Sequence, residues 1–146
     1  HFMINPTKGV MSQLTVEELQ QLLREQFSQC DVVLEKIGPR WARVRVPIKE
    51  QHLRPGGTVS GPTMMTLADT ATYLAILAEI GPVVLAVTTN LTINFMRKPA
   101  SNRDVIGEAQ LLKLGRRLAV AEVRIYSEGE SGLVAHATCT YSIPPH

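Results

Sequence analysis

The segment 59–82, VSGPTMMTLADTATYLAILAEIGP, constrains the fold more than any other part of the chain. Pro62 suits the first turn of a helix with Ser60 or Gly61 as the cap, and Gly81-Pro82 ends the segment. Between these signals, seven apolar residues recur at helical spacing and form one stripe: Met64, Leu67, Ala68, Ala71, Leu74, Ala75 and Ala78. Other apolar residues fall outside the stripe, so the sequence predicts a central helix over about 62–80 that is buried nearly all round.

Asp69 is the one charged residue of this predicted helix before Glu79. It lies too far from the amino end to act as a cap. A carboxylate in an apolar interior is costly unless it is paired or loses its charge, so Asp69 needs a partner or a chemical role. Two interpretations are open. One is a structural contact, either an ion pair with Arg43, Arg45 or Arg124 or a hydrogen bond to a threonine, and the other is a functional carboxylate.

Length and composition narrow the classes of protein that fit. A chain of 146 residues with 45% hydrophobic residues predicts an N-terminal arm over 1–14 and a single domain with a proper core over 15–146. The net charge of +2 is too small to favour nucleic acid, and no apolar run reaches the ~20 residues that cross a bilayer. Cys30 and Cys139 show no metal-ligand spacing, and two cysteines do not make a disulfide scaffold, so we expect a reducing, cytoplasmic location.

Shorter patterned segments flank the central helix. Thr15-Val-Glu-Glu18 is a capping box that opens a predicted surface helix over 15–29. A hairpin follows, with strands over 31–37 and 40–48, a Gly38-Pro39 turn and a loop over 49–61. After the central helix come four more predicted strands, over 84–96, 104–114, 117–127 and 133–143.

The order of these elements indicates the fold class. Strand 40–48 places Ala42, Val44 and Val46 on one face and Arg43 and Arg45 on the other, which is typical of an antiparallel sheet with one solvated face. Helices and strands do not alternate, so a doubly wound parallel sheet is disfavoured. The sequence predicts an α+β fold, with an antiparallel sheet of about six strands wrapped around one long helix.

The central helix and the loop before it resemble the hotdog fold, and within it the 4-hydroxybenzoyl-CoA thioesterase superfamily, most of all the phenylacetate-degradation type. Those thioesterases carry His-Gly-Gly, a short apolar stretch and Leu-Ala-Asp. Here Ser60-Gly61-Pro62 stands at the position of His-Gly-Gly, and Leu67-Ala68-Asp69 matches Leu-Ala-Asp. Segment 90–99, NLTINFMRKP, resembles the family strand that ends in Arg-Pro, and Gly115-Arg116 and segment 132–135 also fit.

This resemblance implies an acyl-CoA thioesterase that hydrolyses an aryl- or short/medium-chain acyl-CoA to the free acid and CoA. It implies no metal and no other cofactor, because the coenzyme A moiety enters as part of the substrate. Asp69 matches the catalytic carboxylate, which is a general base or a nucleophile. Gly61 matches the glycine whose N–H polarises the thioester carbonyl, and Thr88 falls near a serine or threonine that helps to hold the water. Two positions depart from the family, because Ser60 replaces its histidine and Arg54 replaces an asparagine of some relatives.

The chemistry of the residues agrees with these roles. Thioester hydrolysis needs a base that activates water and donors for the developing oxyanion. A helix amino end presents free N–H groups, and because Pro62 has none, Gly61 and the residues just after it must supply them. Asp69 lies about 10 Å further along the helix axis. The carboxylate and the N–H donors of one helix are therefore poorly placed to act on the same carbonyl group. We therefore expect a homodimer with shared sites, in which Met65, Tyr73 and Ile76 pack at the subunit boundary. The resemblance implies that two such dimers assemble further as a dimer of dimers.

Other side chains are candidates for substrate contacts: Ser60, His52, Arg54, Met65 and Tyr73. His52 lies either at the mouth of the site or in solvent as an ordinary loop histidine. A group of basic residues falls in turns at strand ends and suits the phosphates of coenzyme A, or is simply solvated: Arg97, Lys98, Arg116 and Arg117.

Two other functions are compatible with the same residues. A hotdog dehydratase or hydratase acting on acyl thioesters pairs a loop histidine with a helix carboxylate, and His52 with Asp69 could form that pair. A non-catalytic acyl-CoA or lipid binder is also possible, since Ser60 stands where the family has histidine.

Overall fold

The structure is a computed structural model that describes residues 14–55 and 59–145. The predicted N-terminal arm therefore lies outside the described residues, apart from Leu14. The elements in chain order are α1 (Val16–Gln26), β1 (Val33–Gly38), β2 (Trp41–Val46), the short 3-10 helix η2 (Glu50–His52), α2 (Gly61–Ile80), β3 (Val87–Phe95), β4 (Val105–Leu114), β5 (Leu118–Ser127) and β6 (Leu133–Ser142).

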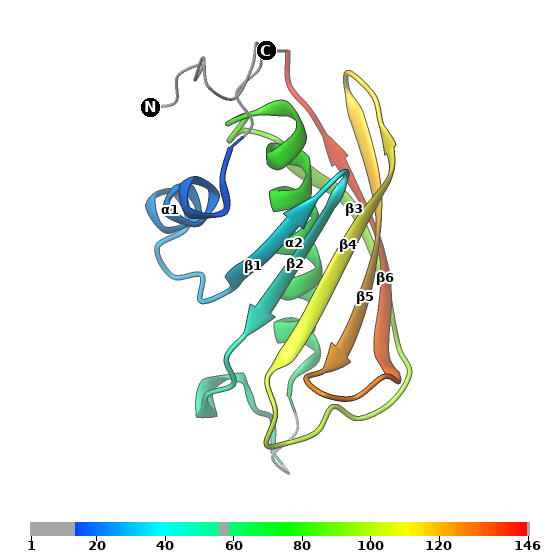
Figure 1. Ribbon diagram of the computed structural model, residues 1–146. Coiled ribbons are helices and arrows are strands. Elements are labelled where there is room, and N and C mark those ends of the chain that lie inside the picture. The colour runs from blue at the N-terminus through cyan, green and yellow to red at the C-terminus, as the bar shows by residue number, and fades with distance from the viewer. Residues whose placement is uncertain (1–13, 56–58, 146) are drawn as a thin grey trace.

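The strands form one six-stranded antiparallel sheet in the order β1-β2-β4-β5-β6-β3. The sheet curves around α2, and α1 lies beside β1 (Figure 1). This architecture confirms the predicted α+β fold and the hotdog arrangement of a sheet wrapped on one central helix. None of the helices within the described residues has both the length and the apolar character needed to cross a bilayer.

The two ends of α2 follow from their capping residues. Ser60 is the N-cap, and its Oγ accepts a hydrogen bond from the Thr63 N–H at 3.2 Å. Gly81 ends the helix with a φ of 94°, a conformation that suits glycine, and its N–H donates to the Leu77 carbonyl oxygen at 2.9 Å. The predicted central helix is thus confirmed, and it begins one residue earlier than expected.

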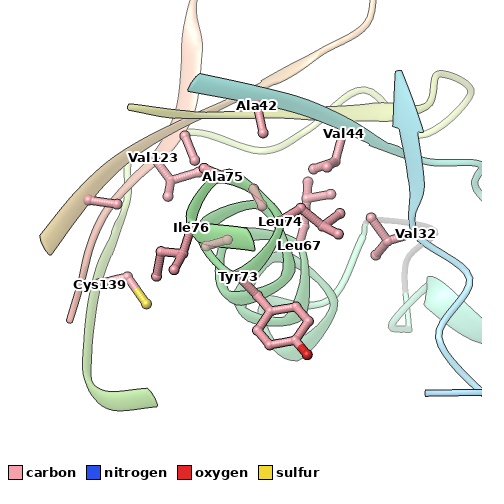
Figure 2. Close-up of a cluster of buried hydrophobic side chains, with 14 of the residues drawn as sticks. Val32, Ala42, Val44, Leu67, Tyr73, Leu74, Ala75, Ile76, Val123 and Cys139 are labelled. Atoms are coloured by element: carbon pink, nitrogen blue, oxygen red, sulfur yellow. The ribbon is translucent and has the colours of Figure 1, made fainter. Parts of the chain in front are cut away.

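The core lies between α2 and the concave face of the sheet. All seven residues of the predicted stripe are buried. Figure 2 shows α2 with Ala42 and Val44 of β2 on one side and Val123 and Cys139 on another, while the Tyr73 ring points away from the sheet. Gly107 lets β4 approach the helix closely, because a Cβ there would lie 3.1 Å from Leu67 Cγ.

The sheet covers more of α2 than the stripe alone indicates. Ile76 lies outside the stripe, yet it is fully buried within its own chain. The expectation that Ile76 packs at a subunit boundary is therefore wrong. The physical reason is the curvature of the sheet, which brings β5 and β6 around a second side of the helix.

Helix α1 is shorter than predicted at its carboxyl end. Both hydrogen bonds of the capping box form, since the Glu18 N–H donates to Thr15 Oγ1 at 3.1 Å and the Thr15 N–H donates to Glu18 Oε1 at 2.9 Å. The helix ends at Gln26 rather than Gln29, because Phe27 leaves the helical conformation with a φ of −137°. This end of α1 packs near α2, where it contributes to the site described below.

Several strand boundaries also differ from the prediction, and two of them have a clear cause in the backbone. The hairpin turns at Pro39-Arg40 rather than at Gly38-Pro39, and Arg40 adopts a φ of 53° instead of beginning the second strand. Strand β3 begins at Val87 rather than at residue 84, because residues 82–86 form tight turns in which the Ala86 N–H donates to the Val83 carbonyl oxygen at 3.1 Å.

The outer face of the sheet carries the predicted charged side chains. Arg45 forms ion pairs with Glu35 at 2.8 Å, Asp104 at 2.9 Å and Glu128 at 2.6 Å, and Arg43 pairs with Glu35 at 3.0 Å. These arginines lie on the face opposite α2. Among the described residues no ion pair includes Asp69, so the interpretation of Asp69 as the partner of Arg43, Arg45 or Arg124 is wrong.

Candidate active site

Asp69 projects from α2 towards the pair of strands β3 and β6. Its Oδ1 accepts hydrogen bonds from Thr88 Oγ1 at 2.5 Å and from Tyr141 Oη at 2.8 Å. Thr88 and Tyr141 are cross-strand partners in the ladder between β3 and β6, so the two hydroxyl groups point from the same face of the sheet. Tyr141 Oη also approaches the Asp69 carbonyl oxygen at 3.2 Å, and the Cys139 thiol lies 3.8 Å from Oδ1.

The contacts of Asp69 are unevenly divided between its two oxygens. Within the part of the chain that the structure describes, every hydrogen bond to the carboxylate ends on Oδ1. Thr88 and Tyr141 therefore fix the orientation of the group, while Oδ2 receives no donor from these residues. Such an arrangement holds a carboxylate in place and keeps one oxygen available for another molecule.

The groups around Asp69 stay protonated at neutral pH. Burial, together with the negative charge of Asp69, raises the pKa of the Cys139 thiol to about 12. The same two causes raise the pKa of the Tyr141 hydroxyl well above its ordinary value. Both groups remain neutral, and Tyr141 acts as a hydrogen-bond donor to the carboxylate.

A pocket of about 640 Å³ opens beside Asp69. Thr88 and Tyr141 line it together with residues from the end of α1, the middle of α2 and the turn before β3: Leu23, Gln26, Phe27, Cys30, Thr66, Thr70, Tyr73, Val84, Leu85, Ala86 and Val87. Among the described residues, Asp69 is the one charged side chain in this lining. The pocket therefore combines a single anchored carboxylate with mainly uncharged walls.

Gly61 lines a different pocket, of about 570 Å³, at the amino end of α2. Arg54, Arg97 and Lys98 lie in the same lining, with Phe95. A Cβ at position 61 would lie 3.3 Å from the Phe95 ring. The structure thus places the two predicted catalytic groups, Asp69 and Gly61, in separate pockets of one chain.

Ser60 and His52 both have structural partners in the loop before α2. Ser60 Oγ accepts the Thr63 N–H and also lies 2.8 Å from Thr63 Oγ1. His52 is 6% exposed, so its interpretation as a solvated loop histidine is wrong. Its Nδ1 accepts a hydrogen bond from the Lys49 N–H at 2.9 Å, which leaves the proton on Nε2, the nitrogen that contacts Asp31.

The remaining predicted residues lie in several places. Tyr73 is buried against the Asp69 pocket, whereas Met65 is 39% exposed. Arg116 and Arg117 line a third pocket, of about 650 Å³, which also includes Ile80 at the carboxyl end of α2. The predicted coenzyme-binding residues therefore form two groups at opposite ends of the central helix.

Sequence reasoning missed Tyr141 as a partner of Asp69. The alternation of β6 contains a signal for it, because Ala137, Cys139 and Tyr141 fall on one face. A tyrosine on an inward face needs a hydrogen-bond acceptor, and Asp69 is the charged group of the helix that this face covers. The exact register between β3 and β6, which brings Thr88 to the same oxygen, has no local signal.

Comparison with known proteins agrees with this architecture. The family model of the thioesterase superfamily matches residues 56–141. Mouse acyl-coenzyme A thioesterase 13 is 28% identical over 138 residues, covering 89% of this chain and 96% of the relative. The chain belongs to the thioesterase superfamily.

Two solved structures extend the comparison. The crystal structure of a candidate thioesterase from Silicibacter sp. TM1040 is 46% identical with a TM-score of 0.84, and the match covers 92% of this chain and 96% of that chain. A mutant form of the phenylacetic acid degradation protein PaaI from Thermus thermophilus is 30% identical with a TM-score of 0.67, covering 77% of this chain and 93% of that chain. The resemblance to the phenylacetate-degradation type of hotdog thioesterase is therefore confirmed.

The raised pKa of Cys139 leads to a prediction about thiol reactivity. In the native protein at pH 8, Ellman's reagent should react with the half-buried Cys30 and leave the fully buried Cys139 intact, because only a thiolate reacts and the Cys139 thiol stays protonated. Both thiols should react in guanidinium chloride. Cys30→Ser should abolish the native reaction, and comparable labelling of Cys139 in the folded protein would contradict its buried, protonated state.

Proposed function

We propose that this protein hydrolyses an aryl- or short/medium-chain acyl-CoA to the free acid and CoA, with Asp69 as general base or nucleophile. The observation that carries the proposal is the anchoring of Asp69 Oδ1 by Thr88 and Tyr141, which leaves Oδ2 available to face the pocket. Oδ2 can take a proton from a water molecule that attacks the thioester carbonyl, or can attack that carbonyl itself. Thr88 fixes the carboxylate and offers its oxygen to the same water.

The donor for the developing oxyanion is assigned to the Gly61 N–H. Pro62 has no N–H, the Thr63 N–H donates to Ser60 Oγ, and the Met64 N–H donates to the Ser60 carbonyl oxygen at 3.3 Å. Among the described residues, the Gly61 N–H is thus the amide of the first helical turn that retains no such partner. It also lies at the positive end of the helix dipole, where a developing negative charge is stabilised.

The proposal includes a second copy of the chain as a partner. Asp69 and Gly61 line separate pockets, so a complete site needs the helix end of another subunit. β3 is the edge strand next to β6, and it exposes Val87 and Phe95, which suits pairing with the same strand of a second copy. The family resemblance extends this assembly to a dimer of dimers.

Coenzyme A is proposed to bind at the amino end of α2. Arg54, Arg97 and Lys98 line the pocket that contains Gly61, and guanidinium and ammonium groups form strong charge-assisted hydrogen bonds with phosphates. Arg116 and Arg117 lie at the other end of the helix, so we restrict the phosphate contacts to the first group. The acyl-coenzyme A substrate of the mouse relative supports this assignment.

No observation favours the alternative hydratase function. Its acid–base pair would need His52 beside Asp69, but the two residues line different pockets and His52 Nε2 contacts Asp31. The experiments below also separate hydrolysis from simple binding of acyl-CoA.

The role of Asp69 is tested by Asp69→Asn, which keeps the shape of the side chain and removes its basicity. We expect kcat for thiol release from a panel of aryl-, short- and medium-chain acyl-CoAs to fall by about 10²- to 10⁴-fold, the range for loss of a general base. Glu130→Gln, in an exposed turn, is the control and should keep wild-type activity. Binding of CoA without any Asp69-dependent thiol release would contradict the hydrolase and favour the non-catalytic binder.

The role of the Gly61 N–H is tested by comparing Gly61→Pro with Gly61→Ala. Proline removes the N–H but suits this position, because the first helical turn tolerates it and Ser60 before it is extended with a ψ of 153°. Alanine keeps the N–H and introduces the same Cβ close to Phe95. Gly61→Pro should lower kcat by about 10²- to 10³-fold, well below Gly61→Ala. Equal activity of the two variants would remove Gly61 as the oxyanion donor.

A further inference from the structure

The end of α1 forms one wall of the Asp69 pocket. Leu23 and Phe27 lie one helical turn apart and both line it, as do Leu85 and Val87. Leu23 is 2% exposed and Phe27 is 45% exposed, so Leu23 forms the buried part of this wall and Phe27 forms its solvent-exposed rim. The helix that precedes the sheet in the sequence therefore contributes directly to the shape of the site.

A row of aromatic rings connects this rim to the carboxylate. The Phe27 ring packs edge-on against Tyr73, with ring centroids 5.5 Å apart and an interplanar angle of 88°. Tyr73 in turn lies 6.1 Å from the ring of Tyr141, whose hydroxyl donates to Asp69. Phe27 thus lies at the far end of the row from the group proposed to perform the chemistry.

The Tyr73 ring is fixed between its two neighbours. Its hydroxyl donates to the Val84 carbonyl oxygen at 3.1 Å, in the turn before β3. Burial raises the pKa of Tyr73 to about 12, so this hydroxyl stays protonated and the hydrogen bond persists at neutral pH. With its polar end occupied, Tyr73 presents its ring to the pocket and gives Phe27 a rigid surface to pack on.

The uncharged walls of this pocket determine which acyl groups it can bind beside Asp69. A thioester carbonyl placed at Asp69 leaves its CoA moiety outside and its acyl group inside, among Leu23, Phe27, Tyr73, Leu85 and Val87. Each methylene group buried there favours binding by about fourfold. This gain continues with chain length until the end of the acyl chain meets the Phe27 ring, which packs on Tyr73.

We propose that Phe27 is the specificity-determining residue for the acyl group, which lies along the Tyr141–Tyr73–Phe27 row and whose length is limited by the Phe27 ring. This inference rests on the proposed thioesterase function, because it takes Asp69 as the position of the thioester carbonyl. The ligand class is an unbranched or aryl acyl group without charge. A charged acyl group would be rejected, since Asp69 is the one charged side chain that the described part of the chain contributes to the lining, and its oxygens serve the reaction.

The test compares kcat/KM across straight-chain acyl-CoAs of increasing length for wild type, Phe27→Ala and Phe27→Trp. Removing the ring should move the preferred length by about two or more carbons towards longer chains, because each additional buried methylene again contributes about fourfold. The larger indole should move the preference towards shorter chains. Leu112→Ala, at an exposed position of β4 outside this lining, is the matched control and should keep the wild-type profile.

The outcomes separate this inference from the proposed function. If Asp69-dependent hydrolysis is present but Phe27→Ala changes all substrates by one common factor, the specificity role is wrong and the thioesterase stands. If no substrate is hydrolysed, the proposed function fails, and calorimetry with non-hydrolysable alkyl-CoA thioethers then tests the pocket by itself. A dependence of affinity on chain length that Phe27→Ala leaves unchanged would overturn the assignment of Phe27.

Discussion

The hydrogen bonds from Thr88 and Tyr141 to Asp69 are the interaction on which the rest of the site depends. They connect the middle of a buried helix to two strands of the sheet, and they give the half-buried carboxylate of Asp69 two hydrogen-bond donors. Because both donors reach Oδ1, they orient the carboxylate while Oδ2 accepts no hydrogen bond from the described residues. The same contacts bring β3 and β6 against α2, so the structural role and the proposed chemical role of Asp69 depend on one set of contacts.

At the amino end of α2, the capping side chain and the proposed oxyanion donor are different groups. Ser60, which replaces the histidine of the related motif, is engaged as the N-cap through Thr63. This cap uses the Thr63 N–H, and Pro62 has none, so the Gly61 N–H is the amide that the first turn can offer to a ligand. The change from histidine to serine is therefore compatible with an oxyanion site made by the backbone, which does not require a side chain at position 60.

Local signals in the sequence were sufficient for most of the fold. The capping box at Thr15, the cap at Ser60, the apolar stripe of α2 and the alternation of β2 each predict an element that the structure confirms. Several element ends were misplaced, and those at Phe27 and Arg40 each depend on a single backbone conformation that neighbouring residues do not specify. Ile76 was misplaced for another reason, since the curvature of the sheet is a property of all six strands together.

The site was predictable only in part. Asp69 is conspicuous as a charge within an apolar helix, but its partner Tyr141 lies 72 residues away and is brought to it by strand register. The environment of His52 also depends on a distant contact, with Asp31, which gives a loop histidine a buried position. Long-range pairing of this kind follows from the packed structure and has no pattern in the neighbouring sequence.

The central claim is that one active site takes Asp69 from one chain and the Gly61 helix end from another. It is tested most directly with purified mixed dimers that carry Asp69→Asn on one chain and Gly61→Pro on its partner, isolated with two different affinity tags. In a shared arrangement one site of each mixed dimer is entirely native and the other has both changes, so kcat should recover to about half of the wild-type value, by the symmetry of a two-fold dimer. Mixed dimers as inactive as the two parent variants would show that each site is built within a single chain and would contradict the account.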